Sequence, residues 1–227
     1  NLKELSSFIK KINKKEKIFV LGAGSNTLFT DRIYDGVVIK LSKNFNNISQ
    51  LSDEIIIAGS SVTDKALSEF AMENDLAGFE FLSCIPGTIG GGIKMNAGCF
   101  GTEFKDIILS VQAMNRSGQI ITIPSSKIKF EYRINNLPKD LIFLSASFRG
   151  KKSNKKNIKP LMEKYKHQKE AAQPTKIKTS GSTFKNPIKQ TDRKVWELIK
   201  DSVSLDTSFG DAVISDKHYN FFVNKGN

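Results

Sequence analysis

Cysteine, histidine and tryptophan are scarce in this chain of 227 residues, which holds two, two and one of them. Cys84 and Cys99 lack the CxxC spacing of zinc and redox sites, so we interpret them as buried free thiols in a reducing compartment and expect no metal site. No apolar run approaches the length that a membrane-spanning helix needs. The chain opens on Asn1-Leu2-Lys3, with neither an initiator methionine nor a signal-peptide pattern. We therefore expect a cytoplasmic protein without membrane insertion.

Acidic residues are also in the minority, because 35 lysines and arginines face 23 aspartates and glutamates and the formal net charge is +12. Such an excess can indicate nucleic-acid binding. Aromatic residues do not alternate with the lysines as stacking platforms, however, and no nucleic-acid motif is present. We expect no nucleic-acid partner and attribute the charge to compositional bias and to attraction for an anionic small molecule. With 39% hydrophobic residues, the chain is typical of one large globular domain or two small ones.

Glycine, in contrast, is concentrated in the segment IPGTIGGGIKMNAGCF, from Ile85 to Phe100, which holds five of the 16 glycines. Glycine contributes no side-chain packing and loses more conformational freedom on folding than any other residue. A cluster of this kind therefore weakens a fold unless the backbone needs a positive φ or approaches a ligand closely. We interpret the segment as a ligand-binding loop.

A second glycine segment, Gly22 to Thr27, follows directly on the apolar run Ile18 to Leu21, which predicts a short strand. Successive backbone N–H groups in such a turn form a concave anion site, and the side chains of Ser25, Asn26 and Thr27 add neutral donors suited to a diphosphate. An ordinary hairpin turn would have the same pattern. The segment alone leaves both interpretations open.

Two common phosphate-binding motifs are excluded by the residues that follow these glycines. Thr27 stands where the dinucleotide motif G-x-G-x-x-G has its third glycine, and the next residues predict a turn at Asp35-Gly36 and a strand at Val37 to Ile39 in place of a helix. A Gly-Lys-Ser/Thr sequence follows neither glycine segment, so a Walker loop is absent too. The ligand must be held by another scaffold.

The rest of the chain predicts an α+β fold from its hydrophobic periodicity. Strands and helices are expected in mixed order, with a hairpin turn at Arg116 to Gly118: helices at 2–12, 64–74 and 159–172, and strands at 18–21, 55–59, 108–115, 119–123 and 141–148. The lysine-rich stretch after Gly150 predicts a domain boundary, and a small module is expected after Pro174.

Five segments, in this order and spacing, resemble the family of UDP-N-acetylenolpyruvoylglucosamine reductase, also called UDP-N-acetylmuramate dehydrogenase or MurB. The glycine segments indicate only a wider class of flavin-binding domains, whereas GSTFKNP is specific for this reductase. The segments are VLGAGSN (20–26), IPGTIGGGIKMNAGCFG (85–101), FEYRINNL (130–137), SGSTFKNP (180–187) and VISDKHYNFFVNKGN (213–227).

The resemblance implies an FAD-binding domain over residues 1–150, made of two α+β subdomains like those of vanillyl-alcohol oxidase and divided near 42–50. An incomplete α+β substrate-binding domain is implied over 151–227. The two glycine segments would hold the FAD diphosphate, ribityl chain and ring through Gly22, Ala23, Gly24, Ser25, Asn26, Thr27, Pro86, Gly87, Thr88, Gly90, Gly91, Asn96 and Ala97. His167 and His218 lie outside both segments, so we predict non-covalent FAD.

The reaction implied by the resemblance reduces UDP-N-acetylglucosamine enolpyruvate to UDP-N-acetylmuramate, with NADPH as co-substrate, for peptidoglycan synthesis. Alone, Arg133 is more typical of a surface ion pair and Ser182 of a helix cap or turn. The resemblance makes Arg133 the group that stabilises the enolate-like intermediate and Ser182 the proton donor. Tyr132, Lys185 and Asn186 are implied to contact the UDP-sugar substrate, although Tyr132, like Tyr165, would also suit simple packing.

Three departures accompany the resemblance. The family's catalytic glutamate falls beyond Asn227, an N-terminal flavin-contacting strand and glycine pair are missing, and Asn135 stands where the family usually has serine. A related flavin oxidase and a non-catalytic module that binds sugar nucleotides remain alternative functions. We expect the protein to be a monomer.

Overall fold

The computed structural model describes residues 1–174 and 177–226. These divide into two compact units, of which unit 1 comprises residues 1–23 and 31–165 and unit 2 comprises residues 24–30, 166–174 and 177–226. Helices and strands alternate irregularly in both, which confirms the predicted α+β class. The domain limits at residue 150 and near 42–50 stay predictions.

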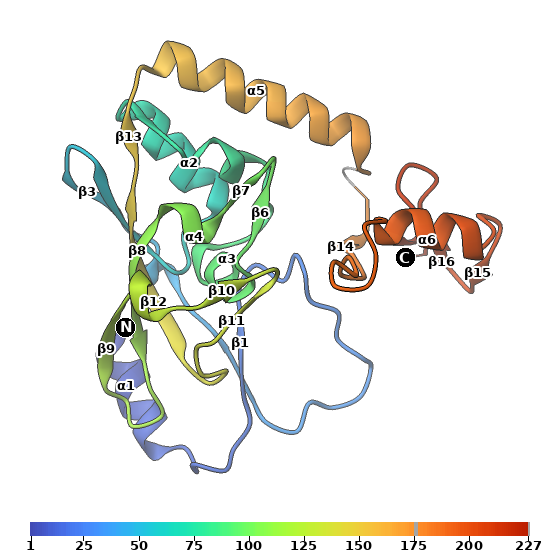
Figure 1. The fold of residues 1–227 in the computed structure, drawn as a ribbon. Coiled ribbons are helices and arrows are strands. Elements are labelled where there is room, and N and C mark those ends of the chain that lie inside the picture. The colour runs from blue at the N-terminus through green and yellow to red at the C-terminus, as the bar shows by residue number, and fades with distance from the viewer. Residues whose placement is uncertain (175–176, 227) are drawn as a thin grey trace. The chain divides into compact units, whose positions relative to one another are not determined.

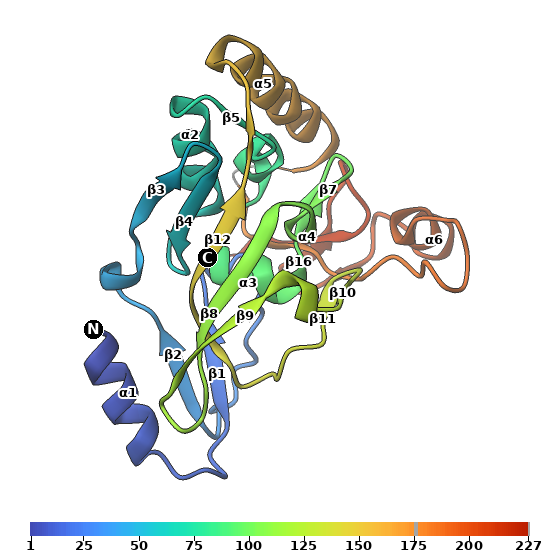
Figure 2. The ribbon, with the colours of Figure 1, turned by 60° about the vertical axis from the view of Figure 1, so that its left-hand side comes forward.

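Unit 1 is built on a five-stranded sheet with the order β3-β4-β12-β8-β9, in which all neighbours are antiparallel (Figure 2). A separate parallel pair joins β1 to β2. The elements are α1 (Leu2–Lys11), β1 (Ile18–Leu21), β2 (Val37–Lys40), η1 (Lys43–Phe45), β3 (Ile48–Ser52), β4 (Ile55–Gly59), α2 (Asp64–Glu73), β5 (Leu76–Ala77), η2 (Glu80–Cys84), α3 (Ile89–Met95), β6 (Gly98–Cys99), β7 (Thr102–Glu103), α4 (Phe104–Ile107), β8 (Ile108–Met114), β9 (Ile120–Pro124), η3 (Ser125–Lys127), β10 (Phe130–Glu131), β11 (Ile134–Asn135), β12 (Ile142–Arg149) and β13 (Lys151–Lys152).

The main core of unit 1 lies between this sheet and the helices α2, α3 and α4. Ile56, Leu67, Phe104 and Phe148 are among its fully buried side chains. A smaller cluster packs α1 against β2, β8 and β12 through residues such as Ile9. Burial of these side chains on one face of each element explains why the period of the apolar residues predicted most of the long elements correctly.

Helix α5 (Lys155–Ala172) begins four residues before its predicted start at Lys159, which directly precedes Pro160. The side chain of Asn154 accepts the N–H of Lys156 at 2.8 Å, and the carboxylate of Asp75 accepts the N–H of Lys155 at 2.7 Å. These acceptors satisfy N–H groups that a helix start leaves unpaired, and Pro160 then removes a single hydrogen bond near that start. The first half of α5 runs beside α2 (Figures 1 and 2).

Unit 2 contains a four-stranded sheet with the order β14-β17-β16-β15 and the helix α6. Its elements are β14 (Thr179–Ser182), α6 (Val195–Ser202), β15 (Ser208–Phe209), β16 (Ala212–Ile214) and β17 (Phe221–Asn224). Trp196, on α6, meets the ring of His218 edge to face with 6.4 Å between the ring centroids. His218 also packs against Phe221, and its partial burial lowers the pKa of the imidazole.

The two predicted free thiols are both present, but only Cys84 is buried, while Cys99 is half-buried. Cys99 donates its S–H to the carbonyl of Phe81. Nearby, Tyr165 stacks on Phe100 with 4.3 Å between the ring centroids. No described helix is long and apolar enough to cross a membrane.

A buried carboxyl opens α2. The hydroxyl of Thr63 accepts the N–H of Ala66 at 3.1 Å as the N-cap, and Asp64 follows as the first helical residue. Asp64 is fully buried, and neither carboxyl oxygen has a hydrogen-bond partner among the described residues. A helix N-terminus favours an ionised carboxylate, but burial without a partner disfavours it more strongly. Burial thus raises the pKa of Asp64 from 3.8 to about 7.

Asp64→Asn is expected to stabilise the protein more at alkaline than at acidic pH. Between pH 3.8 and about 7, folded Asp64 keeps a proton that the unfolded chain releases. The free energy of unfolding of the protein is therefore highest below this range and falls as the pH rises through it. Asparagine has no such proton. At about 1.4 kcal/mol per pKa unit, the advantage of the variant in free energy of unfolding should grow by roughly 4 kcal/mol across the range. Urea titrations at several pH values measure it.

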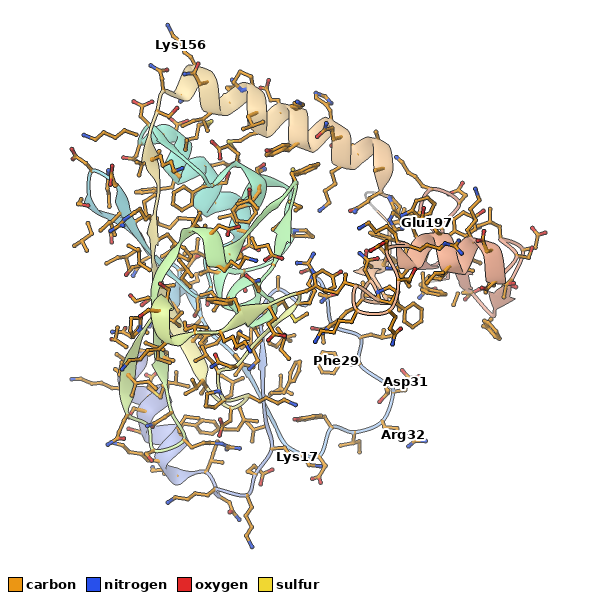
Figure 3. The ribbon with its side chains drawn as sticks, viewed as in Figure 1. Lys17, Phe29, Asp31, Arg32, Lys156 and Glu197 are labelled. Carbon is orange, nitrogen blue, oxygen red and sulfur yellow. The ribbon has the colours of Figure 1, made fainter. Side chains whose placement is uncertain are left out.

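The matched control for this experiment is Asp31→Asn, because Asp31 is exposed and its side chain projects outward from the segment before β2 (Figure 3). Its free energy of unfolding should follow that of the unmodified protein at every pH. An advantage of Asp64→Asn that does not change with pH would contradict the raised pKa.

Candidate active site

The two glycine segments approach each other in unit 1. Gly22 follows β1, and a Cβ atom at this position would lie 2.7 Å from the hydroxyl oxygen of Thr88. A Cβ there would force the Thr88 side chain to shift, so glycine lets the start of the first segment pass close beside the second. The next residues, from Gly24 with its φ of 81° onward, belong to unit 2.

The second glycine segment is held in place by the chain between β4 and α2. The N–H of Gly90 bonds to the carbonyl of Ser60 at 2.9 Å, and the N–H of Ile89 bonds to that of Val62 at 2.9 Å. A Cβ atom at Gly90 would lie 3.1 Å from the Cβ of Ser60, so this close backbone pairing favours glycine. The loop is therefore a fixed part of unit 1, with its backbone shape set by neighbouring main chain.

Packing inside the protein, and not the predicted ligand, explains two of the clustered glycines. A Cβ atom at Gly92 would lie 2.3 Å from the ring of Phe104, and one at Gly98 would lie 2.4 Å from the carbonyl oxygen of Thr102. Gly91 is different, because it is exposed and its nearest potential neighbour is 3.7 Å away.

Gly91 provides a test of whether this loop fits a flavin. A glycine inside a helix costs about 1 kcal/mol relative to alanine, and nothing within unit 1 requires it here. An exposed backbone stripped of side chains suits a flat ligand that must approach closely. With the close approach of Gly22 to Thr88, this supports the fit between the two segments and FAD.

Asn96 ends α3 in the left-handed conformation, with a φ of 40°, and is fully buried. Its amide donates to a carboxylate oxygen of Glu103 at 3.0 Å and to the carbonyl of Glu131 at 3.2 Å, and its side-chain oxygen accepts the N–H of Lys105 at 3.1 Å. Ala97 follows it and donates its N–H to the α3 backbone. Because the side chain of Asn96 is committed to internal bonds, its predicted flavin contact would involve the backbone and stays a prediction.

Arg133 lies at the turn between β10 and β11, with a φ of 59°. Its guanidinium donates to the carbonyl of Asn96 at 3.3 Å and to that of Gly98 at 3.1 Å. The guanidinium carbon also lies 5.3 Å from the ring centroid of Tyr132, within the range of a cation–π contact. The hairpin thus fixes the predicted catalytic arginine against the end of the second glycine segment.

Asn135, which departs from the family pattern, is part of the same arrangement. Its amide donates to the carbonyls of Ile93 and Lys94 at 2.9 and 3.1 Å, and its side-chain oxygen accepts the N–H of Leu137 at 3.0 Å. These carbonyls lie in the last turn of α3, where intrahelical donors run out, although that of Ile93 also accepts the N–H of Asn96 at 3.2 Å. Asn135 therefore fastens the hairpin of Arg133 to α3, a role that the sequence did not reveal.

Ser182 ends β14 in unit 2, where it is exposed and pairs with Phe221 of β17. The ladder shifts register between Thr179 and Ser182, and Gly181 between them has a φ of 84°. This bulge re-aims the end of the strand, as bulges next to functional sites commonly do. Gly181 also lies near Ser25, whose carbonyl oxygen would be 4.0 Å from a Cβ at Gly181.

The two other predicted substrate residues of unit 2 lie shortly after Ser182. Lys185 is exposed. Asn186 is half-buried, and its side-chain oxygen accepts the N–H of Val195 at 3.0 Å at the start of α6. Among the described residues, no group of three or more histidine, cysteine, aspartate or glutamate side chains could hold a metal ion.

Comparison with known proteins identifies the family of this chain. A model described as an FAD binding domain matches residues 1–124, and a model described as the UDP-N-acetylenolpyruvoylglucosamine reductase C-terminal domain matches residues 173–227. The chain belongs to the UDP-N-acetylenolpyruvoylglucosamine reductase family. A member from Pelagibacter ubique is 65% identical over 227 residues, which cover 100% of this chain and 75% of the relative.

Further members support the assignment. The reductase of Rickettsia typhi is 46% identical over 224 residues, covering 99% of this chain and 75% of that protein. The crystal structure of the reductase from Thermus caldophilus superposes with a TM-score of 0.86 at 29% identity, covering 100% of this chain and 80% of that one. The order of elements found here is thus that of the reductase family along the whole chain.

The histidines of this chain are His167 and His218 alone, and neither lies in a glycine segment where it could be linked covalently to the flavin. We therefore expect FAD to be released completely on denaturation. The Nδ1 atom of His218 accepts the N–H of Asn220 at 3.2 Å, and His167 is exposed on α5, outside both glycine segments. Acid precipitation followed by absorbance of the pellet and supernatant measures the release, with a covalent flavoprotein treated alike as the control. Flavin retained on the precipitated chain would contradict non-covalent binding.

Proposed function

We propose that this chain reduces the enolpyruvyl group of UDP-N-acetylglucosamine enolpyruvate and so forms UDP-N-acetylmuramate, a precursor of peptidoglycan. The observation that carries the proposal is the position of Arg133. Its guanidinium donates to the backbone carbonyls of Asn96 and Gly98, at the end of the second glycine segment. The matches to both family models and to reductases across the whole chain support it.

FAD is the cofactor, and the residues proposed to hold it are Gly22–Thr27 together with Pro86, Gly87, Thr88, Gly90, Gly91, Asn96 and Ala97. The close approach of Gly22 to Thr88 and the exposed backbone at Gly91 support this assignment. The chemistry that FAD supplies when bound is transfer of a hydride from NADPH to the enolpyruvyl group. The chain itself must provide charge stabilisation and a proton.

Arg133 is proposed to stabilise the negative charge that develops on the substrate carboxylate as hydride adds to the double bond. A guanidinium is planar, keeps its charge at all working pH values and offers several donors, so it can bind a carboxylate while two donors stay on backbone carbonyls. Anchoring to Asn96 and Gly98 holds it without reorganisation during the reaction, which is the condition for effective electrostatic stabilisation.

Ser182 is proposed to donate the proton that the adjacent carbon needs after hydride addition. A serine hydroxyl is a weak acid, so this role requires a strongly basic carbanion in a site closed to water. Tyr132, Lys185 and Asn186 are proposed to contact the substrate, with Lys185 as an electrostatic aid to the uridine diphosphate.

The experiment that tests this function is anaerobic stopped-flow mixing of the NADPH-reduced protein with UDP-N-acetylglucosamine enolpyruvate, followed by flavin absorbance. Rapid reoxidation is expected with this substrate, and none is expected with UDP-N-acetylglucosamine, which lacks the enolpyruvyl group. Failure of the reduced flavin to reoxidise with this substrate, together with reduction of the oxidised flavin by a small alcohol and fast reoxidation by oxygen, would replace the proposal by a flavin oxidase. Absence of flavin absorbance after reconstitution would leave a sugar-nucleotide-binding module.

We also propose that the protein acts as a monomer in the cytoplasm. Cys84 and Cys99 are both thiols in the structure, which supports a reducing compartment. Sedimentation velocity at micromolar concentration would reveal a dimer, and fractionation of cells would show where the protein resides.

A further inference from the structure

Asn220 uses every polar group it has, and three of its four hydrogen bonds go to the two residues after Ser182. Its backbone carbonyl accepts the N–H of Thr183 at 2.9 Å, its side-chain oxygen accepts the N–H of Phe184 at 2.9 Å, and its side-chain amide donates to the carbonyl of Phe184 at 2.8 Å. The fourth bond runs from its own N–H to the Nδ1 atom of His218. Asn220 is 3% exposed.

These bonds begin where the sheet ends. Ser182 is the last residue of β14, and its pairing with Phe221 follows the register shift at Gly181. Thr183 and Phe184 lie outside the strand and are exposed. A bulged strand end with an exposed continuation has freedom to move, and the bonds to Asn220 fix the backbone on the far side of Ser182.

From this geometry we infer that Asn220 is a positioning residue, which holds the Ser182 hydroxyl in its working orientation by clamping Thr183 and Phe184. The inference rests on the proposed role of Ser182 as proton donor. Proton transfer requires correct placement within hydrogen-bond reach, and a displacement of about 1 Å can cost about 10²-fold in rate. Asparagine suits the position because its short side chain presents one donor and one acceptor to a single neighbouring peptide unit.

The test uses Asn220→Ala in the intact FAD-loaded protein, with the two half-reactions measured separately by stopped flow. Reduction of the flavin by NADPH needs no proton from Ser182 and should be unchanged. Reoxidation by UDP-N-acetylglucosamine enolpyruvate should slow by about 10- to 100-fold, with a larger solvent isotope effect because proton transfer becomes more limiting. Asn220→Asp keeps the acceptor for the N–H of Phe184 but places a carboxyl oxygen against the carbonyl of Phe184, so it should slow the same step as well.

A second readout does not depend on activity. Amide hydrogen exchange at Thr183 and Phe184 should become faster in Asn220→Ala, because both N–H groups lose or loosen their acceptor. Asn224→Ala is the matched control, since Asn224 is an exposed asparagine at the end of β17, and its side-chain oxygen accepts the N–H of Gly226. It should leave both half-reactions and both exchange rates unchanged.

A double-mutant cycle with Ser182→Ala separates this inference from the proposed function. If Asn220 acts through Ser182, the double variant should reoxidise no more slowly than Ser182→Ala alone. Full additivity of the two losses, or reoxidation of Asn220→Ala at the original rate, would overturn the positioning role. Normal turnover of Ser182→Ala would instead overturn the proposed proton donor, whatever Asn220→Ala does.

Discussion

Ser182→Ala is expected to slow the reoxidation of the reduced enzyme by substrate about 10²- to 10⁴-fold, the usual contribution of a positioned general acid. Flavin reduction by NADPH should keep its rate, since Ser182 is assigned only to protonation of the substrate carbon. Anaerobic stopped-flow absorbance measures both steps on the same preparation. A loss confined to the second step would assign the hydroxyl to the chemistry of the substrate.

The control for this change is Ser208→Ala, which removes an exposed hydroxyl from β15 at the opposite edge of the same four-stranded sheet. It should behave like the unmodified enzyme in both steps. Equal slowing of both steps in Ser182→Ala would point to general damage of unit 2, and a fully active variant would remove Ser182 from the mechanism.

Arg133→Ala is expected to lower the rate of the same step about 10²- to 10³-fold, because the developing negative charge loses its fixed counter-charge. Arg133→Lys should recover only part of the loss. An ammonium is a compact point charge and cannot keep donors on the carbonyls of Asn96 and Gly98 while it also binds a carboxylate in a planar, bidentate manner. Single-turnover rates at saturating substrate measure the loss apart from binding.

Arg149→Ala provides the comparison, since Arg149 is an exposed arginine at the end of β12. Its rates should match those of the unmodified enzyme at the same ionic strength, which excludes a general effect of net charge. If Arg133→Lys were as active as the original enzyme, the geometry of the guanidinium would not matter and charge alone would suffice.

The elements that the sequence predicted well are those whose identity is decided by local pattern. β1 was predicted with its observed limits from a continuous apolar run, and α2 within one residue because its apolar side chains recur on one helical face. The start of α5 was misplaced because Asp75, distant in sequence, satisfies its first N–H. The two-residue strands, such as β10 and β11, were missed because a strand of two residues is too short to show a period.

The candidate site shows the same division. Motifs selected Arg133 and Ser182, but they could not show what holds them, because those contacts join segments far apart in the chain. Asn135 reaches back to the end of α3, and Asn220 reaches back across 36 residues to Phe184. Likewise, Gly92 and Gly91 look alike in sequence, and only the ring of Phe104 beside one of them distinguishes a packing requirement from an open surface.

The position of Trp196 has a practical consequence. It is the single tryptophan of the chain and lies in unit 2, against His218. Indole emission during heating therefore reports the melting of one unit alone, whereas far-ultraviolet circular dichroism sums the backbone of both. Any separation between the two transition temperatures would measure how far the halves of the molecule lose their structure independently.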